Sequence, residues 1–225
     1  MSNGTAFLFD LDGTLVDSVY EHVLAWRRAL EEVGIDMSVW RIHRRIGMSG
    51  GLFINALLRE TEMDVTAEQV ERIQTLHTHA YQNLAAQVRP LPGARELLSA
   101  LSAAEVPWAI ATSGLWEVAA PVLKTLGVPE NVPIVTRDQV LHAKPDPDLF
   151  LAAAERLGVD IESAVVVGDS IWDLLAARRA RALGVGLLSG GYGRAELETA
   201  GAYRVYEDPA DLLLHLDEVG VRSAV

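Results

Sequence analysis

The chain has 225 residues, 50% of them hydrophobic, and no cysteine, which allows one large or two small domains with a buried core. The absence of cysteine excludes disulfides, thiolate metal sites and a cysteine nucleophile. A net charge of −12 disfavours nucleic acid as a partner. No apolar run approaches the roughly 20 residues that cross a bilayer. The first residues do not resemble a signal peptide. We therefore expect a cytoplasmic protein without a membrane or nucleic-acid partner.

The first predicted element is an apolar strand over residues 6–10. It ends in Asp10, and a second acid, Asp12, follows two residues later. Side chains two residues apart along a strand point to the same face, so we expect the two carboxylates to lie close together. Such a pair costs free energy unless a proton or a cation lies beside it.

Residues 17–89 contain no comparable strand and show helical spacing instead. One helical pattern spans residues 21–34, a second begins near residue 51, and a third follows Thr66, which we interpret as its N-cap. The stretch 89–94 contains two prolines and a glycine and marks the end of this region. We predict an all-helical domain over residues 17–89 and call it the cap.

Short apolar runs recur in the rest of the chain, and helical patterns separate them. The predicted strands cover residues 107–113, 132–136, 164–169, 184–189 and 203–206. Such alternation is typical of a parallel sheet that helices cover on both faces. We therefore predict an α/β fold, with a doubly wound, Rossmann-like core of residues 1–16 and 90–225 and the all-α cap inserted after the first strand.

Ligands of open α/β sheets bind at the carboxyl ends of the strands, and this chain places acids, hydroxyls and one lysine there. These residues are Asp10, Asp12, Thr112, Ser113, Gly114, Lys144, Asp169 and Asp173. Several carboxylates without a thiolate suit a hard divalent cation, Mg²⁺ above all. The cation would remove the repulsion between the acids and leave open positions for a phosphate.

The acids then have separate predicted roles. Asp10 can attack phosphorus and form an aspartyl-phosphate, and Asp12 can protonate the leaving oxygen and later deprotonate water. Asp169 would bind the metal, and Asp173 would support it or orient Lys144.

The phosphate itself needs donors that meet the charge on its oxygens. We expect Thr112, the backbone N–H groups of Ser113 and Gly114, and Lys144 to hold the phosphoryl group during transfer.

Four segments in this order, FDLDGTLVDS, ATSG, KPDP and GDSIWD, resemble the motifs of the haloacid dehalogenase-like hydrolases. Within that family the chain is similar to the capped branch of phosphoglycolate phosphatases and β-phosphoglucomutases, from Phe7 to about Tyr206. The resemblance implies Mg²⁺ held by Asp10, Asp169 and the backbone carbonyl of Asp12, and a cap that closes over the substrate. It implies a Mg²⁺-dependent phosphatase that hydrolyses a small organic phosphate monoester, a phosphorylated metabolite, through an aspartyl-phosphate.

Two other functions stay open: a β-phosphoglucomutase-like phosphosugar mutase, and a non-enzymatic phospho-acceptor module. His22 matches a position where the mutase branch carries an acid/base histidine, and residues 46–50 resemble that branch's cap loop. However, the mutase loop has an arginine at the position of Gly50, and its fourth motif has an acid at the position of Gly168. The oligomeric state, monomer or homodimer, and the ester that is hydrolysed also stay open.

Cap residues near the site are the candidates for substrate contact, namely His22, Arg45 and Ser49. We expect Arg44, Arg45 and the loop 46–51 to lie over the site, with the alternative that both arginines lie on the solvated face of the cap. His77 and His79 are two residues apart and do not share a helix face. We interpret them as surface or cap histidines rather than metal ligands.

Overall fold

The computed structural model describes residues 5–61 and 66–221. Within these residues six parallel strands form one sheet in the order β5-β4-β1-β6-β7-β8. The strands are β1 (Ala6–Phe9), β4 (Trp108–Ala111), β5 (Ile134–Val135), β6 (Ala164–Gly168), β7 (Leu183–Leu187) and β8 (Arg204–Tyr206). The predicted α/β fold and its doubly wound sheet are confirmed, and the strand predicted at 132–136 is shorter than expected.

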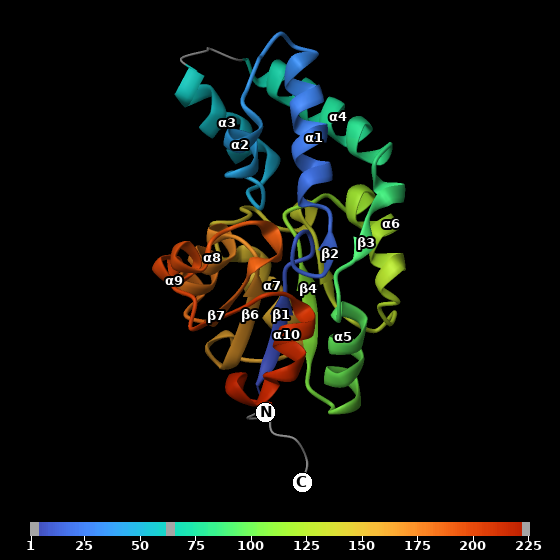
Figure 1. The fold of residues 1–225 in the computed structure, drawn as a ribbon, viewed down its shortest axis with the longest axis vertical. Helices are drawn as coiled ribbons and strands as arrows, with labels where there is room; N and C mark the ends of the chain where they lie inside the picture. The colour runs from blue at the N-terminus through green and yellow to red at the C-terminus, as the bar shows by residue number, and fades with distance from the viewer. Residues whose placement is uncertain (1–4, 62–65, 222–225) are drawn as a thin grey trace.

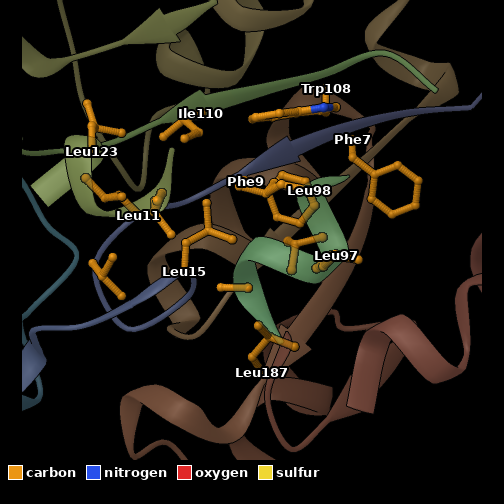
Figure 2. Close-up of a cluster of buried hydrophobic side chains, with 14 of the residues drawn as sticks. Phe7, Phe9, Leu11, Leu15, Leu97, Leu98, Trp108, Ile110, Leu123 and Leu187 are labelled. Carbon is orange, nitrogen blue, oxygen red and sulfur yellow. The ribbon is translucent and has the colours of Figure 1, made fainter. Parts of the chain in front are cut away.

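Helices cover both faces of the sheet because successive strand side chains point to opposite sides. Phe7 and Phe9 belong to a buried cluster that includes residues of α5 (Ala94–Ala103), α6 (Trp116–Leu126) and α10 (Pro209–Leu214). Part of this cluster is drawn in Figure 2. Leu8 packs on the other face, in a cluster with residues of α7 (Asp148–Leu157) and α8 (Ile171–Ala180). Beside α8 lies α9 (Arg194–Ala200).

The remaining helices gather beyond the carboxyl end of the sheet, as Figure 1 shows. They are α1 (Val19–Glu31), α2 (Val39–His43), α3 (Gly50–Thr61) and α4 (Ala67–Gln82). A separate apolar cluster that includes Trp26, Phe53 and Ile73 holds them together. Helix α4 begins as predicted, because the Thr66 hydroxyl accepts a hydrogen bond from the backbone N–H of Gln69.

The chain passes between sheet and helices at two adjacent points. There β2 (Val16–Asp17) and β3 (Arg89–Pro90) pair antiparallel. The pair lies at both ends of the predicted cap, although the division into two domains at residues 17 and 89 stays a prediction. Among the described helices, none has the length and apolar character needed to cross a membrane.

Candidate active site

Asp10 stands directly after β1, and its backbone N–H still donates to the carbonyl of Val167 at 2.9 Å. The strand ladder thus fixes the backbone that carries this buried carboxylate. The chain then turns at Gly13, whose φ is +82°, and a Cβ there would lie 2.6 Å from Oδ2 of Asp169. Glycine at this position therefore lets the turn cross closely over Asp169. Thr14 Oγ1 from the same turn donates to Asp169 Oδ1 at 3.0 Å.

Lys144 is the only lysine or arginine that is buried within the described residues, and its side chain is 0% exposed. Its Nζ contacts Oδ1 of Asp10 and lies 2.7 Å from Oδ1 of Asp173. Burial opposes the lysine charge, but the two acids outweigh it and raise the pKa of Lys144, so the ammonium persists. Oδ2 of Asp173 accepts from the backbone N–H and the hydroxyl of Ser170, so Ser170 holds the carboxylate that contacts Lys144.

Three buried carboxylates, those of Asp10, Asp169 and Asp173, each place one oxygen within 4.8 Å of the others. Burial raises the pKa of Asp10 to about 7, and burial with the neighbouring Asp173 and Asp10 charges raises that of Asp169 well above its usual value. A group of acids that resists ionisation this way fits a divalent cation with oxygen ligands. Both oxygens of Asp173 are engaged, Oδ1 by Lys144 and Oδ2 by Ser170, whereas Lys144 contacts only Oδ1 of Asp10. Asp10 and Asp169 are therefore the better candidates for metal ligands.

Asp12 turns its carboxylate toward the helices of the cap rather than toward that cluster. Its Oδ1 accepts from Ser18 Oγ at 2.6 Å and lies 3.2 Å from Nε2 of His22. Burial alone would raise the pKa of Asp12, but His22 and the Ser18 hydroxyl together hold it below its usual range. With Oδ1 engaged by Ser18 and His22, this geometry is compatible with the expected metal contact through the backbone carbonyl of Asp12.

The segment after β4 forms the next part of the site. Thr112 continues the sheet, with its N–H donating to Val135 O at 2.9 Å. Its Oγ1 accepts from the N–H of Gly114 at 2.9 Å, and Ser113 Oγ donates to the carbonyl of Gly47 in the cap at 2.8 Å. Thr112 and Gly114 therefore lie together at the strand end, whereas the Ser113 hydroxyl bonds to the cap.

A cavity of about 320 Å³ separates these core residues from the cap. The core contributes to its lining Asp10, Asp12, Thr112, Ser113, Gly114, Leu115, Val118, Arg137 and Asp138. The cap contributes His22, Trp26, Arg45, Ile46, Gly47, Met48, Gly50, Gly51, Phe53, Gln74, His77 and Thr78. The predicted contacts His22 and Arg45 thus reach the cavity. Ser49 is buried and is not part of the lining.

Arg44 lies outside this cavity and instead ties the cap to the core. Its guanidinium pairs with Glu196 at the first turn of α9 and stacks over the ring of Tyr192 at 4.2 Å. The Tyr192 hydroxyl donates to the carbonyl of Arg44, and Nε2 of His43 lies 2.8 Å from Gly190 O. The expectation that Arg44 and Arg45 lie over the site together is met by Arg45 alone.

Sequence reasoning did not place His77, Trp26 or Tyr81 at the site. His79 is exposed, as a surface histidine should be, but His77 is only 9% exposed and contacts His22. The i, i+4 spacing of His77 with Tyr81 and of His22 with Trp26 could have indicated two ring-bearing helix faces.

Comparison with known proteins gives relatives over most of the chain. A family model for the haloacid dehalogenase-like hydrolases matches residues 5–181. Hexitol phosphatase A of Escherichia coli (strain K12) is 36% identical over 168 residues, which are 73% of this chain and 74% of that protein. A phosphoglycolate phosphatase of Agrobacterium fabrum is 32% identical over 187 residues, which are 81% and 80% of the two chains.

Among solved structures, that of a hydrolase from Pseudomonas syringae is similar throughout. It matches with a TM-score of 0.94 and 57% sequence identity, and the match covers 96% of this chain and 100% of that one. The likeness therefore includes both the sheet and the helices beyond its carboxyl end.

Proposed function

Because the chain belongs to the haloacid dehalogenase-like hydrolases, we propose that it is a Mg²⁺-dependent phosphatase. Its substrate is a small organic phosphate monoester, and the reaction proceeds through an aspartyl-phosphate on Asp10. The single observation that carries this proposal is the position of Asp10. A buried carboxylate in contact with the only buried ammonium of the described chain borders a cavity that a second acid, Asp12, also lines.

In the first step a carboxylate oxygen of Asp10 attacks phosphorus, and the bond from phosphorus to the leaving oxygen breaks. The sheet hydrogen bond at its backbone and the ammonium of Lys144 hold Asp10 in position before the reaction, which lowers the entropic part of the barrier. Lys144 and Thr112 meet the charge on the phosphoryl oxygens. The N–H of Gly114, which bonds Thr112 Oγ1 in this structure, is a further donor at the same strand end.

Asp12 transfers the protons. It gives a proton to the leaving oxygen, and in the second step takes one from the water that attacks the phosphoaspartate. Inorganic phosphate then leaves and the Asp10 carboxylate is restored. Ser18 and His22 hold Asp12 on the side of the cavity that the cap closes.

The donor set fits Mg²⁺, which prefers oxygen ligands. Asp10, Asp169 and the backbone carbonyl of Asp12 would hold it, and Asp173 would act on Lys144 instead. Mg²⁺, when bound, supplies positive charge that offsets the buried carboxylates and the phosphoryl oxygens.

Two features of this chain support hydrolysis over phosphosugar mutation. A Cβ at Gly168 would lie 2.3 Å from the Cβ of Asp173. The site therefore has no room for the acid that the mutase branch has at this position. The mutase branch has an arginine in its cap loop at the position of Gly50. Gly50 lines the cavity here, but it has no side chain that could take the place of that arginine.

The test is phosphate release from an activated aryl phosphate and from a panel of small phosphates, including hexitol phosphates and phosphoglycolate, with and without Mg²⁺. We expect release that needs Mg²⁺ and a marked preference for one class of the panel. Interconversion of hexose phosphate isomers without net phosphate release would instead identify a mutase. Phosphorylation of the protein without turnover would identify a phospho-acceptor module.

A further inference from the structure

Two imidazoles in the cap form a continuous path to Asp12. His22 of α1 lies with Nε2 at 3.2 Å from Asp12 Oδ1 and with Nδ1 at 3.2 Å from Nε2 of His77 on α4. Both histidines are buried. The path therefore begins at the proposed general acid/base in the core and ends inside the cap.

Aromatic rings fix the planes of both imidazoles. The ring of His22 stacks on Tyr81 with centroids 3.9 Å apart and an interplanar angle of 7°. The ring of His77 stacks on Trp26 at 3.9 Å and 14°, and Trp26 stacks in turn on Phe53 at 4.2 Å. Stacking holds the plane of a ring but does not decide which edge points where. A rotation of the His22 ring by half a turn about its Cβ–Cγ bond would keep the ring plane. It would direct a ring carbon at Asp12 in place of Nε2.

Hydrogen bonding at the other edge decides between these two orientations. Oδ1 of Asp12 accepts both when Asp12 is ionised and when its proton is on Oδ2, so Nε2 of His22 carries the hydrogen between them. Burial and the nearby His22 lower the pKa of His77 well below its usual value, so His77 is neutral. A neutral imidazole can either donate to or accept from Nδ1 of His22, and which nitrogen carries a hydrogen is set by the partner of the other.

We propose that His77 is a positioning residue for the general acid/base. By bonding Nδ1 of His22, it keeps the Nε2 hydrogen of that ring directed at Asp12, so the cap presents an ordered donor to the core. The proposal rests on the role of Asp12 in the proposed function. It assigns His77 no contact with the reacting atoms.

Three variants test this in the full-length protein. His77→Phe keeps a ring to stack on Trp26 but has no hydrogen-bonding edge, whereas His77→Gln keeps an amide that can donate or accept. His79→Phe, at the exposed position two residues on, is the matched control. The measurement is kcat/KM for a series of aryl phosphates whose phenols differ in pKa.

With His77→Phe we expect a loss of about tenfold for poor leaving groups and less than about twofold for activated ones. This is part of the roughly 10²–10⁴-fold that general acid–base catalysis supplies. His77→Gln should restore most of the rate, and His79→Phe should behave as the wild type. In an Asp12→Asn background, His77→Phe should cause no further dependence on the leaving group.

A second measurement does not depend on turnover. Nitrogen-15 spectra of the histidine rings should show Nε2 of His22 protonated in the wild type and in His77→Gln. In His77→Phe they should show exchange between ring orientations or tautomers. An unchanged His22 spectrum in His77→Phe would overturn the proposal even if that variant were too unstable for kinetics.

Equal losses for all leaving groups would make His77 a structural residue only and would overturn the proposal. A rise in KM for the best substrate without a steeper leaving-group dependence would assign His77 to substrate contact and overturn it too. Both results leave the wild type an active phosphatase. If the wild type releases no phosphate from any ester, the proposed function itself fails.

Discussion

The core and the cap line the same cavity but differ in the side chains that they bring to it. On the core side, the acids at the strand ends are buried around one ammonium, that of Lys144. On the cap side, the lining consists of rings and glycines, of Ile46, Met48, Gln74 and Thr78, and of one guanidinium, that of Arg45. The core residues are held by sheet hydrogen bonds, whereas the cap residues stand on helices joined to the sheet through β2 and β3.

The proposed function assigns bond breaking to the core side of the cavity and substrate recognition to the cap side. Charged groups that act on phosphorus are useful only if the backbone fixes them, and strand ends provide that. Side chains that contact the rest of a substrate can differ from one relative to another without loss of phosphoryl transfer. Substitutions in the core should therefore lower turnover for every ester, and substitutions in the cap should change some esters more than others.

The largest effect should follow the removal of the proposed nucleophile. We expect Asp10→Asn to reduce kcat by roughly 10⁴-fold or more for every substrate, on the scale of other covalent nucleophiles, because an amide cannot attack phosphorus. The fold should survive, as circular dichroism would show. Asp36→Asn, an exposed acid in the cap, is the matched control. Hydrolysis near the wild-type rate by Asp10→Asn would remove the nucleophile assignment.

Metal removal should also abolish turnover of all esters. We expect excess chelator to stop phosphate release, Mg²⁺ to restore it, and Ca²⁺ to inhibit. Ca²⁺ takes more ligands at longer distances than Mg²⁺, and such coordination could engage both oxygens of Asp10. Full activity in chelator, or equal support by Ca²⁺, would contradict the assignment of Mg²⁺.

The same site makes a prediction for stability. Burial raises the pKa of Asp10 to about 7, above its ordinary 3.8, so its folded form binds a proton more tightly than its unfolded form. The tighter proton binding contributes fully to the free energy of unfolding below about pH 3.8, and this contribution is lost as the pH rises through about 7. Melting temperatures of metal-free protein should fall between about pH 5.5 and 7.5, and Mg²⁺ should raise them more at the higher pH. A Mg²⁺ effect of equal size at both pH values would argue against a metal at Asp10.

Loss of the second acid should depend on the substrate's leaving group. We expect Asp12→Ala to slow hydrolysis of alkyl phosphates by roughly 10²–10⁴-fold, the usual scale of general acid–base catalysis. An activated aryl phosphate, whose leaving oxygen needs no proton, serves as the internal control and should lose much less in its first step. The ratio of kcat/KM values for the two substrates is the measurement. Equal losses would exclude Asp12 as the acid.

The smallest effects should distinguish two neighbouring arginines of the cap. Arg45 lines the cavity, so Arg45→Ala should lower kcat/KM for the best natural substrate by about 10-fold or more, the scale of a hydrogen bond to a charged group. A generic aryl phosphate should be affected much less. Arg44→Ala removes the partly exposed pair with Glu196, and such pairs contribute little. We expect it to cause small losses that are the same for every substrate. If Arg45→Ala also acts uniformly, specificity must come from His22 and its neighbours.

Much of the core site could be predicted from sequence because it follows from local rules. An apolar run that alternates with helices predicts a buried parallel strand, and the carboxyl ends of such strands meet at one edge. That is enough to bring Asp10, Lys144 and Asp169 together across more than 150 residues of chain. The α/β fold class and the start of α4 at Thr66 were accessible for the same reason.

Only the tertiary structure decided the cap side of the cavity. His77 contacts His22 across 55 residues because α1 and α4 pack with their ring-bearing faces together, and the sequence gives no register for two packed helices. Arg44 and Arg45 are adjacent in sequence, yet one faces α9 and the other the cavity. Strand periodicity ties a side chain to one of two faces, whereas the direction of a side chain on a packed helix or turn depends on neighbours that are distant in the chain.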